Sequence, residues 1–309
     1  MSSWTIADIP SQSGKLALVT GGTRGLGFET ARALARAGTE VVLTGRNDAK
    51  GNEAVVKIRQ QSASVKVEYQ RCDLANSASV RDFARRFADT RAALHLLVNN
   101  AGVMAIPRRE TTADGFEMQF GVNYLAHFAL TAHLLPLLRM AACARVVSLS
   151  SLAHRTGTID FRDLQGERFY NPWKAYGQSK LAMLMFALEL QRRSDSAQWN
   201  FMSIAAHPGW SSTDLFTSGP GGSSLFSIAS QFAAPFLSQP AEAGALPILF
   251  AATDPKARGG GYYGPGGFSE LTGPPSKASM MIQARDSATA KRLWDISETL
   301  TGVSFEGAH

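Results

Sequence analysis

The stretch Thr20-Gly21-Gly22-Thr23-Arg24-Gly25-Leu26-Gly27 decides the fold, because it joins an apolar run over Leu16–Thr20 to an amphipathic stretch over Phe28–Ala37. Glycines at a strand-to-helix turn allow a tight bend and let the backbone approach a pyrophosphate, whose charge is stabilised at a helix N-terminus. A glycine-rich turn alone is weak evidence. Its position between a first strand and a first helix indicates a nucleotide-binding turn.

The chain beyond this turn alternates between two hydrophobic periods. Short apolar runs typical of buried strands occur at Leu16–Thr20, Val41–Thr44, Val65–Tyr69, Leu94–Val98, Arg145–Leu149 and Phe201–Ala206. Helix-like amphipathic stretches separate them, at Phe28–Ala37, Ala49–Gln61, Ser77–Ala88, Gly115–Leu138 and from Trp173 to about Arg193. This alternation predicts an α/β fold, with a Rossmann-type doubly wound parallel sheet that helices cover on both faces.

The remainder of the chain predicts a lid and further helices instead of a second domain. Residues 207–240 are rich in Gly, Ser, Pro and Phe, and loops of that length are usually functional or disordered. Their many apolar side chains favour a mobile cover. Helices are expected at Ala241–Ala252 and Ser287–Thr299, on either side of the glycine-rich Gly259–Gly267. We therefore expect a single domain over 1–309, with a cofactor-binding and catalytic core (15–206), a C-terminal substrate lid (207–240) and C-terminal helices on the substrate side (241–309).

The composition excludes several classes of protein. Apolar residues make up 45% and charged residues 18% of the 309 residues, which is typical of a compact globular chain. The formal charge is +6, but the arginines form isolated pairs instead of one basic run, so we expect no nucleic-acid partner. Cys72 and Cys143 have no paired spacing, so we expect neither a disulfide framework nor a metal site.

The start of the chain has no targeting pattern. Met1 to Lys15 lack a basic segment followed by an apolar run. No apolar stretch reaches the ~18 residues that a membrane span needs. We therefore expect no secretory signal, no membrane span and a cytoplasmic location.

Further landmarks follow the glycine turn in a fixed order. They are Cys72-Asp73-Leu74 after the third predicted strand, Asn99-Asn100-Ala101-Gly102 after the fourth, Asn123 in the long helix, Ser151 at the end of the fifth strand, Tyr176-Gly177-Gln178-Ser179-Lys180, and Pro208-Gly209 with Thr213 after the sixth strand. With these landmarks the chain resembles the short-chain dehydrogenase/reductase family. The resemblance covers essentially Lys15 to Thr213 and extends more loosely to the end.

The resemblance implies a nicotinamide dinucleotide as cofactor. In the family, the Asp after the third strand contacts the adenine, the Asn-Asn-Ala-Gly signature lies beside the adenosine ribose, and the Pro-Gly segment binds the nicotinamide carboxamide. The residues that we assign to the cofactor on this basis are Gly21, Thr23, Arg24, Gly25, Leu26, Gly27, Arg46, Asp73, Leu74, Asn99, Asn100, Ala101, Gly102, Tyr176, Lys180, Pro208, Gly209 and Thr213.

The end of the second predicted strand favours NADP(H) over NAD(H). An acidic residue there would hold the ribose 2′-hydroxyl of NAD and repel a 2′-phosphate. The sequence has Gly45 where the acid would be, and Arg46 follows it. A guanidinium binds phosphate oxygens in a forked geometry. Arg24, inside the glycine turn, matches a second basic position of the NADP-using members of the family.

Tyr176 and Lys180 stand one helical turn apart, so both project from one face of the helix. Reduction of a carbonyl needs a proton for the oxygen as hydride reaches the carbon. The pKa of a free phenol, about 10, is too high for that exchange near neutral pH. A nearby ammonium and the positive nicotinamide ring would lower the pKa of Tyr176. Lys180 would also hold the hydroxyls of the nicotinamide ribose, by resemblance.

Ser151 is expected to donate a hydrogen bond to the substrate oxygen. Ser150 is the alternative, since adjacent side chains on a strand point to opposite faces and only one serine can face the cofactor. The family pattern favours Ser151. Asn123 is suited to hold a water that links Lys180 to solvent, a proton relay in the family. Its amide side chain could also satisfy backbone groups at a helix kink, and this alternative is compatible with the relay role. His154 and His207 are interpreted as structural or pocket-lining.

The segment between Ser151 and Tyr176 is longer than in many members of the family. Together with Ser150-Ser151-Leu152-Ala153-His154, it resembles the branch that contains retinol dehydrogenases and light-dependent protochlorophyllide reductases. The lack of a cysteine near Tyr176 puts the protochlorophyllide reading in doubt. The branch implies a bulky apolar ketone, aldehyde or alcohol as substrate. The side chains expected to line its pocket are Met104, Leu152, Trp210, Leu215 and Phe216.

Two other functions share parts of this pattern. A sugar-nucleotide epimerase has the same Tyr-Lys pair and cofactor fold, but its glycine spacing differs and its chain is usually longer. A non-catalytic sensor of nicotinamide nucleotides typically loses the tyrosine or the lysine, and this chain keeps both. The family resemblance also implies a homodimer or homotetramer, formed through helices that include the one with Tyr176.

Overall fold

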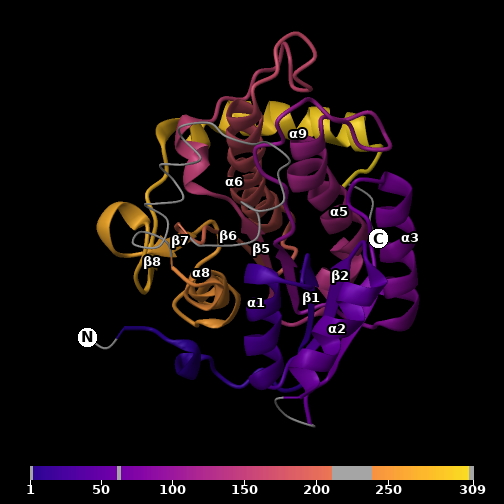
Figure 1. The fold of residues 1–309 in the computed structure, drawn as a ribbon, viewed down its shortest axis with the longest axis vertical. Coiled ribbons are helices and arrows are strands. Elements are labelled where there is room, and N and C mark those ends of the chain that lie inside the picture. Colours follow the sequence, from indigo (N-terminus) through magenta and orange to yellow (C-terminus); the bar gives the residue numbers. More distant parts are fainter. Residues whose placement is uncertain (1–2, 61–63, 211–238, 306–309) are drawn as a thin grey trace.

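The computed structural model describes residues 3–60, 64–210 and 239–305 (Figure 1). Its strands are β1 (Leu16–Thr20), β2 (Glu40–Gly45), β3 (Val67–Arg71), β4 (Leu96–Asn99), β5 (Ala144–Leu149), β6 (Phe201–Ala206), β7 (Tyr262–Pro265) and β8 (Pro275–Lys277). Its α-helices are α1 (Gly25–Arg36), α2 (Asp48–Arg59), α3 (Ser77–Thr90), α4 (Met118–Phe120), α5 (Ala126–Met140), α6 (Pro172–Ala197), α8 (Ala241–Thr253) and α9 (Ser287–Thr301).

Within the described residues, the strands form one eight-stranded sheet in the order β3-β2-β1-β4-β5-β6-β7-β8. Every neighbouring pair is parallel except β7 and β8. The strand order reverses between β1 and β4, and ligands of doubly wound sheets bind in the crevice outside the carboxyl ends of the strands at such a point. The predicted doubly wound α/β fold is confirmed.

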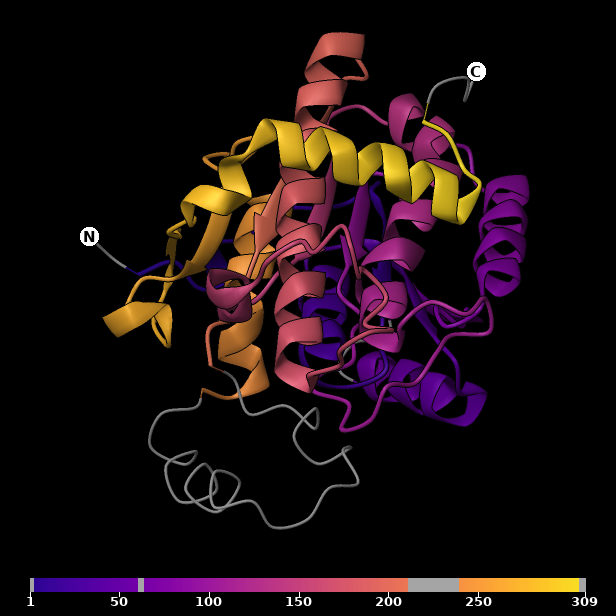
Figure 2. The same ribbon diagram turned by 90° about the horizontal axis from the view of Figure 1, so that it is seen from above.

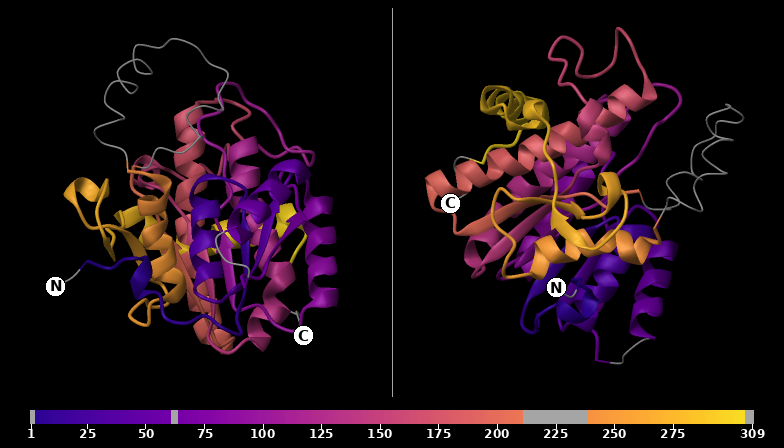
Figure 3. Two further views of the ribbon diagram at one scale, coloured as in Figure 1. Left: turned by 60° about the horizontal axis from the view of Figure 1, so that its bottom comes forward. Right: turned by 90° about the vertical axis from the view of Figure 1, so that its left-hand side faces the viewer.

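Two hydrophobic layers enclose the sheet. On one face, α1, α2 and α8 cover side chains such as Val19, Val41 and Ile204. On the other face, α3, α5 and α6 pack together, and α9 lies outside them (Figure 2). The right-hand view of Figure 3 shows α9, in yellow, beyond α6 on the side opposite α1 and α2. The burial of strands on both faces explains why they read as continuous apolar runs.

Local sequence signals set the start of α6, the helix that carries Tyr176. The Asn171 side chain accepts hydrogen bonds from the backbone N–H groups of Trp173 and Lys174, and Pro172 occupies the first turn of α6. Both are favoured at helix N-termini. The helix begins one residue before the predicted Trp173 and continues past Arg193 to Ala197.

The structure corrects three of the predicted elements. The predicted helix over Gly115–Leu138 begins only at Met118, and a π-helical turn over Gly121–Leu125 separates α4 from α5. The fifth strand ends at Leu149, so Ser151 lies two residues beyond it, where it caps a short 3-10 turn over Leu152–Thr156. Strands β7 and β8 were not predicted. Among the described residues, no helix is both long and apolar enough to cross a bilayer.

Candidate active site

The glycine turn lies at the carboxyl end of β1, beside the point where the strand order reverses. Gly21 and Gly25 have φ angles of 65° and 56°, a conformation that L side chains rarely adopt. A Cβ on Gly27 would overlap with Gly21 O and with the side-chain nitrogen of Asn100. The turn therefore needs glycine for backbone geometry and for close packing, and the backbone at the start of α1 is left open to a phosphate group.

Asn100 fixes the glycine turn to the end of β4. Its side-chain Nδ2 donates to Thr20 O at 2.7 Å, and its backbone N–H donates to Thr20 Oγ1 at 2.9 Å. The backbone N–H of Ala101 donates to the same hydroxyl at 3.0 Å. The side chain of Asn99, in contrast, is fully buried and donates to Thr131 Oγ1. Of the predicted signature, Asn100 and Ala101 therefore shape the cofactor turn, and the Asn99 side chain points into the core.

His127 connects this turn to the helix that carries Asn123, and the sequence analysis missed it. Its Nδ1 lies 2.9 Å from Asn123 O and its Nε2 lies 2.9 Å from Thr20 Oγ1. Complete burial lowers the pKa of His127 to about 4, so the ring is neutral near pH 7. Because a carbonyl can only accept, Nδ1 carries the proton and Nε2 accepts from the Thr20 hydroxyl.

Asn123 lies in the π-helical turn, and its side chain is engaged with protein groups. Oδ1 accepts from Val103 N at 2.7 Å, and Nδ2 donates to Val103 O and to Ser179 Oγ, each at 2.9 Å. This side chain thus fastens the loop after β4 to the catalytic helix, as expected for a residue at a helix kink. The proton-relay role of Asn123 stays a prediction, and it would have to use the backbone carbonyl.

Tyr176 and Lys180 lie on one face of α6, next to Gly102. The Lys180 Nζ is 5.8 Å from the centre of the Tyr176 ring, and it donates to Leu149 O at 3.1 Å. A Cβ on Gly102 would lie 3.5 Å from that nitrogen. Burial lowers the pKa of Lys180 to about 8. Burial also raises the pKa of Tyr176, and the hydrogen bond of Ser151 opposes this rise.

The expected lowering of the Tyr176 pKa includes the charge of the nicotinamide ring, so it stays a prediction, whereas the protein alone raises that pKa. Desolvation of the phenolate exceeds the stabilisation from its neighbours, since Tyr176 is only 7% exposed. A further positive charge close to the ring would be needed to favour the phenolate. The oxidised nicotinamide ring is such a charge.

The two adjacent serines have different environments. Ser150 is buried and donates from Oγ to Lys180 O at 2.8 Å. Ser151 is half-buried, and its hydroxyl accepts from Ala153 N at 3.2 Å and interacts with the Tyr176 phenol. Ser150 thus supports the backbone of α6, whereas Ser151 lies on the side of Tyr176.

The end of β2 carries the residues predicted to select the cofactor. Arg24 and Arg46 are exposed, and Thr23 and Gly45 are half-buried. A third arginine, Arg71, which the sequence analysis did not single out, lies opposite Gly45 in the parallel register of β2 and β3. Arg71 forms an ion pair with Asp48 at 3.5 Å. Asp48, the first acidic residue after Arg46 in the sequence, is therefore paired with an arginine.

The predicted adenine contacts lie at the end of β3. One carboxylate oxygen of Asp73, Oδ1, accepts from Ala75 N at 3.0 Å, and Ser79 Oγ accepts from Asp73 N. Leu74 packs against the core on the α5 side. These contacts order the segment after β3, where Cys72 N also donates to Gly45 O at the end of β2.

The residues predicted to bind the nicotinamide lie in and after the turn that follows β6. Pro208 and Gly209 are half-buried, and Gln239 holds the turn through a hydrogen bond from Nε2 to Pro208 O at 2.7 Å. Thr213, Leu215 and Phe216 lie outside the described residues. The flanking residues Trp210 and Gln239 are joined by a hydrogen bond from Gln239 N to Trp210 O at 2.9 Å.

Three of the predicted pocket residues are described. Met104 and Leu152 are half-buried, and Trp210 is 38% exposed. Trp173, which the sequence analysis named only as a helix start, is 50% exposed, and its ring lies edge-on to Tyr176 at 6.4 Å between centroids. Trp173 therefore places an apolar side chain beside the tyrosine.

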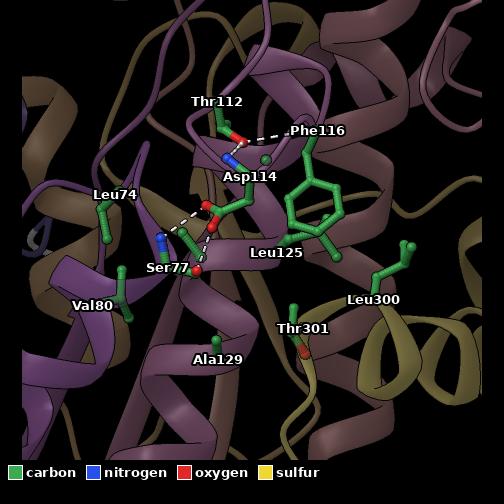
Figure 4. A pocket seen from close by; sticks show the side chains of 12 residues that line it. Leu74, Ser77, Val80, Thr112, Asp114, Phe116, Leu125, Ala129, Leu300 and Thr301 are labelled. Atoms are coloured by element: carbon green, nitrogen blue, oxygen red, sulfur yellow. Dashed lines mark hydrogen bonds between the residues drawn. The ribbon is translucent and has the colours of Figure 1, made fainter.

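A separate pocket lies between α3, α5 and the end of α9 (Figure 4). It encloses about 180 Å³ and is lined by apolar side chains that include Leu125, Phe116 and Leu300, with Asp114 and Ser77 hydrogen-bonded at its rim. Ser151, Tyr176 and Lys180 do not line it. It is distinct from the cluster around Tyr176.

Taken together, the glycine cradle, the Asn100 bridge and the open end of β2 fit a dinucleotide along the carboxyl edge of the sheet. The cradle leaves no room for a Cβ at Gly27, and backbone N–H groups at the start of α1 face this edge. A phenol, an ammonium and a hydroxyl meet at the other end. This donor set suits proton transfer to or from an oxygen atom.

Comparisons with known proteins agree with this geometry. The family model described as short chain dehydrogenase matches residues 15–220. Polyprenol dehydrogenase of Mus musculus is 42% identical over 300 residues, covering 96% of this chain and 86% of that protein. Retinol dehydrogenase 12 of Mus musculus is 38% identical over 293 residues, covering 95% and 88%. A crystal structure of a protein from Mycobacterium Paratuberculosis superposes with a TM-score of 0.81 at 38% identity, covering 98% and 99%.

Proposed function

The chain belongs to the short chain dehydrogenase family, in the branch of the retinol dehydrogenases, and we propose that it uses NADP(H) to interconvert an apolar alcohol and the matching aldehyde or ketone. It is an oxidoreductase of a family that binds NAD or NADP. The observation that carries the proposal is the meeting of the Tyr176 phenol, the Lys180 ammonium and the Ser151 hydroxyl beside the glycine turn.

The reaction requires a proton at the substrate oxygen and a hydride at the adjacent carbon. When bound, NADP(H) supplies or accepts the hydride. Tyr176 donates the proton in reduction and accepts it in oxidation, because its phenol is a proton donor that interacts with the Ser151 hydroxyl. Ser151 holds the substrate oxygen through a hydrogen bond that strengthens as negative charge develops there.

Lys180 supports this proton transfer through its charge. The ammonium lies 5.8 Å from the Tyr176 ring and is held by Leu149 O, so it stabilises a phenolate electrostatically. Its lowered pKa, about 8, lets it exchange protons near neutral pH. Asn123 and Ser179 keep the loop after β4 against this part of α6.

The preference for NADP(H) rests on the charges at the end of β2. Gly45 leaves the position without a carboxylate, and the exposed Arg46 follows it. The exposed Arg24 lies in the glycine turn, next to Thr23, whose methyl group is 3.0 Å from where a Cβ on Gly45 would lie. Arg71 pairs with Asp48, which reduces repulsion of a 2′-phosphate by that carboxylate. A guanidinium bound to a phosphate in the forked geometry discriminates strongly for the phosphorylated cofactor.

The substrate class follows from the side chains around the tyrosine and from the relatives. Met104, Leu152, Trp210 and Trp173 offer apolar surface, and Leu215 and Phe216 are added to the pocket as part of the proposal. The relatives named above are called polyprenol dehydrogenase and retinol dehydrogenase. We therefore expect long, apolar, isoprenoid-like alcohols and aldehydes to be better substrates than short polar ones.

The test is a spectrophotometric screen of nicotinamide oxidation and reduction at 340 nm. Apolar aldehydes, ketones and alcohols of increasing length are offered with NADP(H) and with NAD(H). Turnover should rise with apolar length and with NADP(H), and Tyr176→Phe should lower kcat by roughly 10²–10⁴-fold, the usual contribution of an acid-base group. Tyr263→Phe is the matched control, because that hydroxyl accepts from Arg258 N, on the α8 side and away from Tyr176 in the sequence. Full activity of Tyr176→Phe would refute the assignment.

A further inference from the structure

The segment between β7 and β8, at the edge of the sheet in Figure 1, has an unusual backbone. It is closed by hydrogen bonds from Gly266 N to Pro274 O and from Gly267 N to Thr272 O. Within it, Ser269 and Glu270 have φ angles of 51° and 61°. Two consecutive non-glycine residues in this region cost conformational free energy, and such strain persists only where the surroundings hold the residues in place.

Three donors hold the carboxylate of Glu270. His207 Nε2 lies 3.1 Å and an Arg155 guanidinium nitrogen 2.9 Å from Oε2, and Ser279 N donates to Oε1 at 2.8 Å. Partial burial raises the pKa of Glu270, but the hydrogen bonds from His207 and Ser279 outweigh it and bring the pKa to about 2. The carboxylate therefore stays ionised over the whole working pH range.

One side of Glu270 leads to the turn after β6. Gly209 N donates to His207 Nδ1 at 3.1 Å, so the neutral ring carries its proton on Nε2 and donates it to Glu270. Burial lowers the pKa of His207, which favours this neutral form. The neighbour of Glu270, Leu271, accepts from Trp210 N at 2.8 Å, and a Cβ on Gly209 would overlap with Leu271 O. The Pro208-Gly209 turn thus packs closely against the segment between β7 and β8 that contains Glu270.

The other side of Glu270 leads to the turn that Ser151 caps. Arg155 belongs to the 3-10 turn over Leu152–Thr156, whose first backbone N–H groups face the Ser151 hydroxyl. His154, the residue before Arg155, lies 2.6 Å from Ser151 O through its Nδ1. The ion pair between Arg155 and Glu270 therefore ties the serine turn to the same carboxylate.

We propose that Glu270 is a positioning residue that fixes the Pro208-Gly209 turn and the Ser151 turn relative to each other. The inference rests on the proposed function, in which the first turn meets the nicotinamide and the second meets the substrate oxygen. In this inference Glu270 itself contacts neither the nicotinamide nor the substrate oxygen. It sets their spacing through His207 and Arg155, so its loss acts on the nicotinamide end of the site and leaves the adenine end, at β2 and β3, unchanged.

Glu270→Gln tests this inference, because it keeps the shape of the side chain and removes the charge. Binding of NADPH and of 2′,5′-ADP, which lacks the nicotinamide half, is measured by calorimetry. We expect NADPH to bind about tenfold more weakly and kcat to fall by about tenfold or more, with 2′,5′-ADP unaffected. Arg155→Lys, which retains a charge for Glu270, should fall between wild type and Glu270→Gln.

Glu189→Gln is the matched control. Glu189 is also a buried carboxylate that forms ion pairs with two arginines, Arg192 and Arg193, but it lies in the C-terminal half of α6. It should bind both ligands as the wild type does. Equal weakening of NADPH and 2′,5′-ADP in Glu270→Gln would mean a general structural role and would overturn the inference, as would unchanged binding and kcat.

Hydrogen exchange of the cofactor-free protein separates this inference from the proposed function. In Glu270→Gln, peptides that contain Gly209 and Trp210 and peptides that contain Leu152 to Arg155 should lose protection together, while β1 and β2 keep theirs. Unchanged protection in these peptides overturns the positioning role even if wild type proves inactive. Failure of the wild type to bind either nucleotide would refute the proposed cofactor and leave the exchange result to decide on Glu270.

Discussion

Lys180→Met should stabilise the cofactor-free protein while it abolishes turnover. Lys180 is 5% exposed, and its ammonium donates to Leu149 O at 3.1 Å. No other cause than burial contributes to its lowered pKa. The protein therefore keeps a charge in a place where the charge is disfavoured. Methionine has a similar length and no charge, so it fills the same space without that cost.

The magnitude follows from the pKa of Lys180. A fall from the ordinary value of 10.5 to about 8 corresponds to about 3 kcal/mol of free energy at neutral pH. Loss of the hydrogen bond to Leu149 O gives back about 1 kcal/mol. We expect a net gain of about 2 kcal/mol in the free energy of unfolding, which corresponds to a rise in Tm of roughly 3 °C for a chain of this size.

The pH dependence has a definite sign. Between pH 8 and 10.5 the unfolded chain binds the Lys180 proton and the folded protein has released it, so the stability of the wild type rises with pH in this window. Lys180→Met has no ionisable group at this position, so its stability lacks this rise with pH. The advantage of the variant should be complete below pH 8 and should vanish as the pH approaches 10.5.

Denaturant unfolding of both proteins from pH 7 to 10 measures this difference. Lys57→Met is the control, because Lys57 is an exposed lysine paired with Glu53 on α2, and its substitution should change stability by less than about 0.5 kcal/mol. A Lys180→Met protein that is less stable than wild type at pH 7, or a difference that does not change with pH, would refute the reasoning.

Three further predictions concern the cofactor end and the core. Arg46→Asp should raise the KM for NADPH by about tenfold or more and leave the KM for NADH nearly unchanged, as measured by steady-state kinetics, and equal effects would contradict the 2′-phosphate assignment. Gly27→Ala should lose about 1–3 kcal/mol of stability, because its Cβ would overlap with Gly21 O, and it should bind either cofactor more weakly. Calorimetry measures both effects, and wild-type stability and affinity would contradict the packing argument. Trp294→Ala should cost about 3–5 kcal/mol in denaturant unfolding, since Trp294 is 1% exposed, and a loss below 1 kcal/mol would show that the α9 contact is dispensable.

Most of the sheet could be predicted from the sequence, because buried parallel strands are apolar throughout and stand out from the helices between them. Strand β7 could not. It lies within the glycine-rich segment Gly259–Gly267, and it becomes a strand through pairing with Ala205 and Ala206 of β6. Gly264 is needed there because a Cβ would overlap with the His207 ring. This requirement arises only in the folded chain.

The predictability of the site follows the same division. Tyr176 and Lys180 could be predicted as a pair because their spacing along one helix fixes their common face. The environments of Ser150 and Ser151 could not be separated by strand alternation, because β5 ends at Leu149 before either serine. Glu270 belongs to no sequence motif that would mark it as part of a site. It reaches the site through the turn between β7 and β8, and its partners are visible only in three dimensions.

The position of α9 has a consequence for how the protein is made. The ring centroid of Trp294 on α9 lies 4.9 Å from that of Phe128, and the ring centroid of Phe305 lies 4.4 Å from that of Trp294, so rings synthesised after α5 and α6 complete an aromatic cluster begun on α5. On the ribosome, strands β1 to β6 emerge before α9, so the outer face of α5 and α6 stays uncovered until α9 has been synthesised. A premature stop before Trp294 would preserve every proposed catalytic residue and still leave a chain with an exposed apolar face. Such a product should be captured by chaperones or degraded.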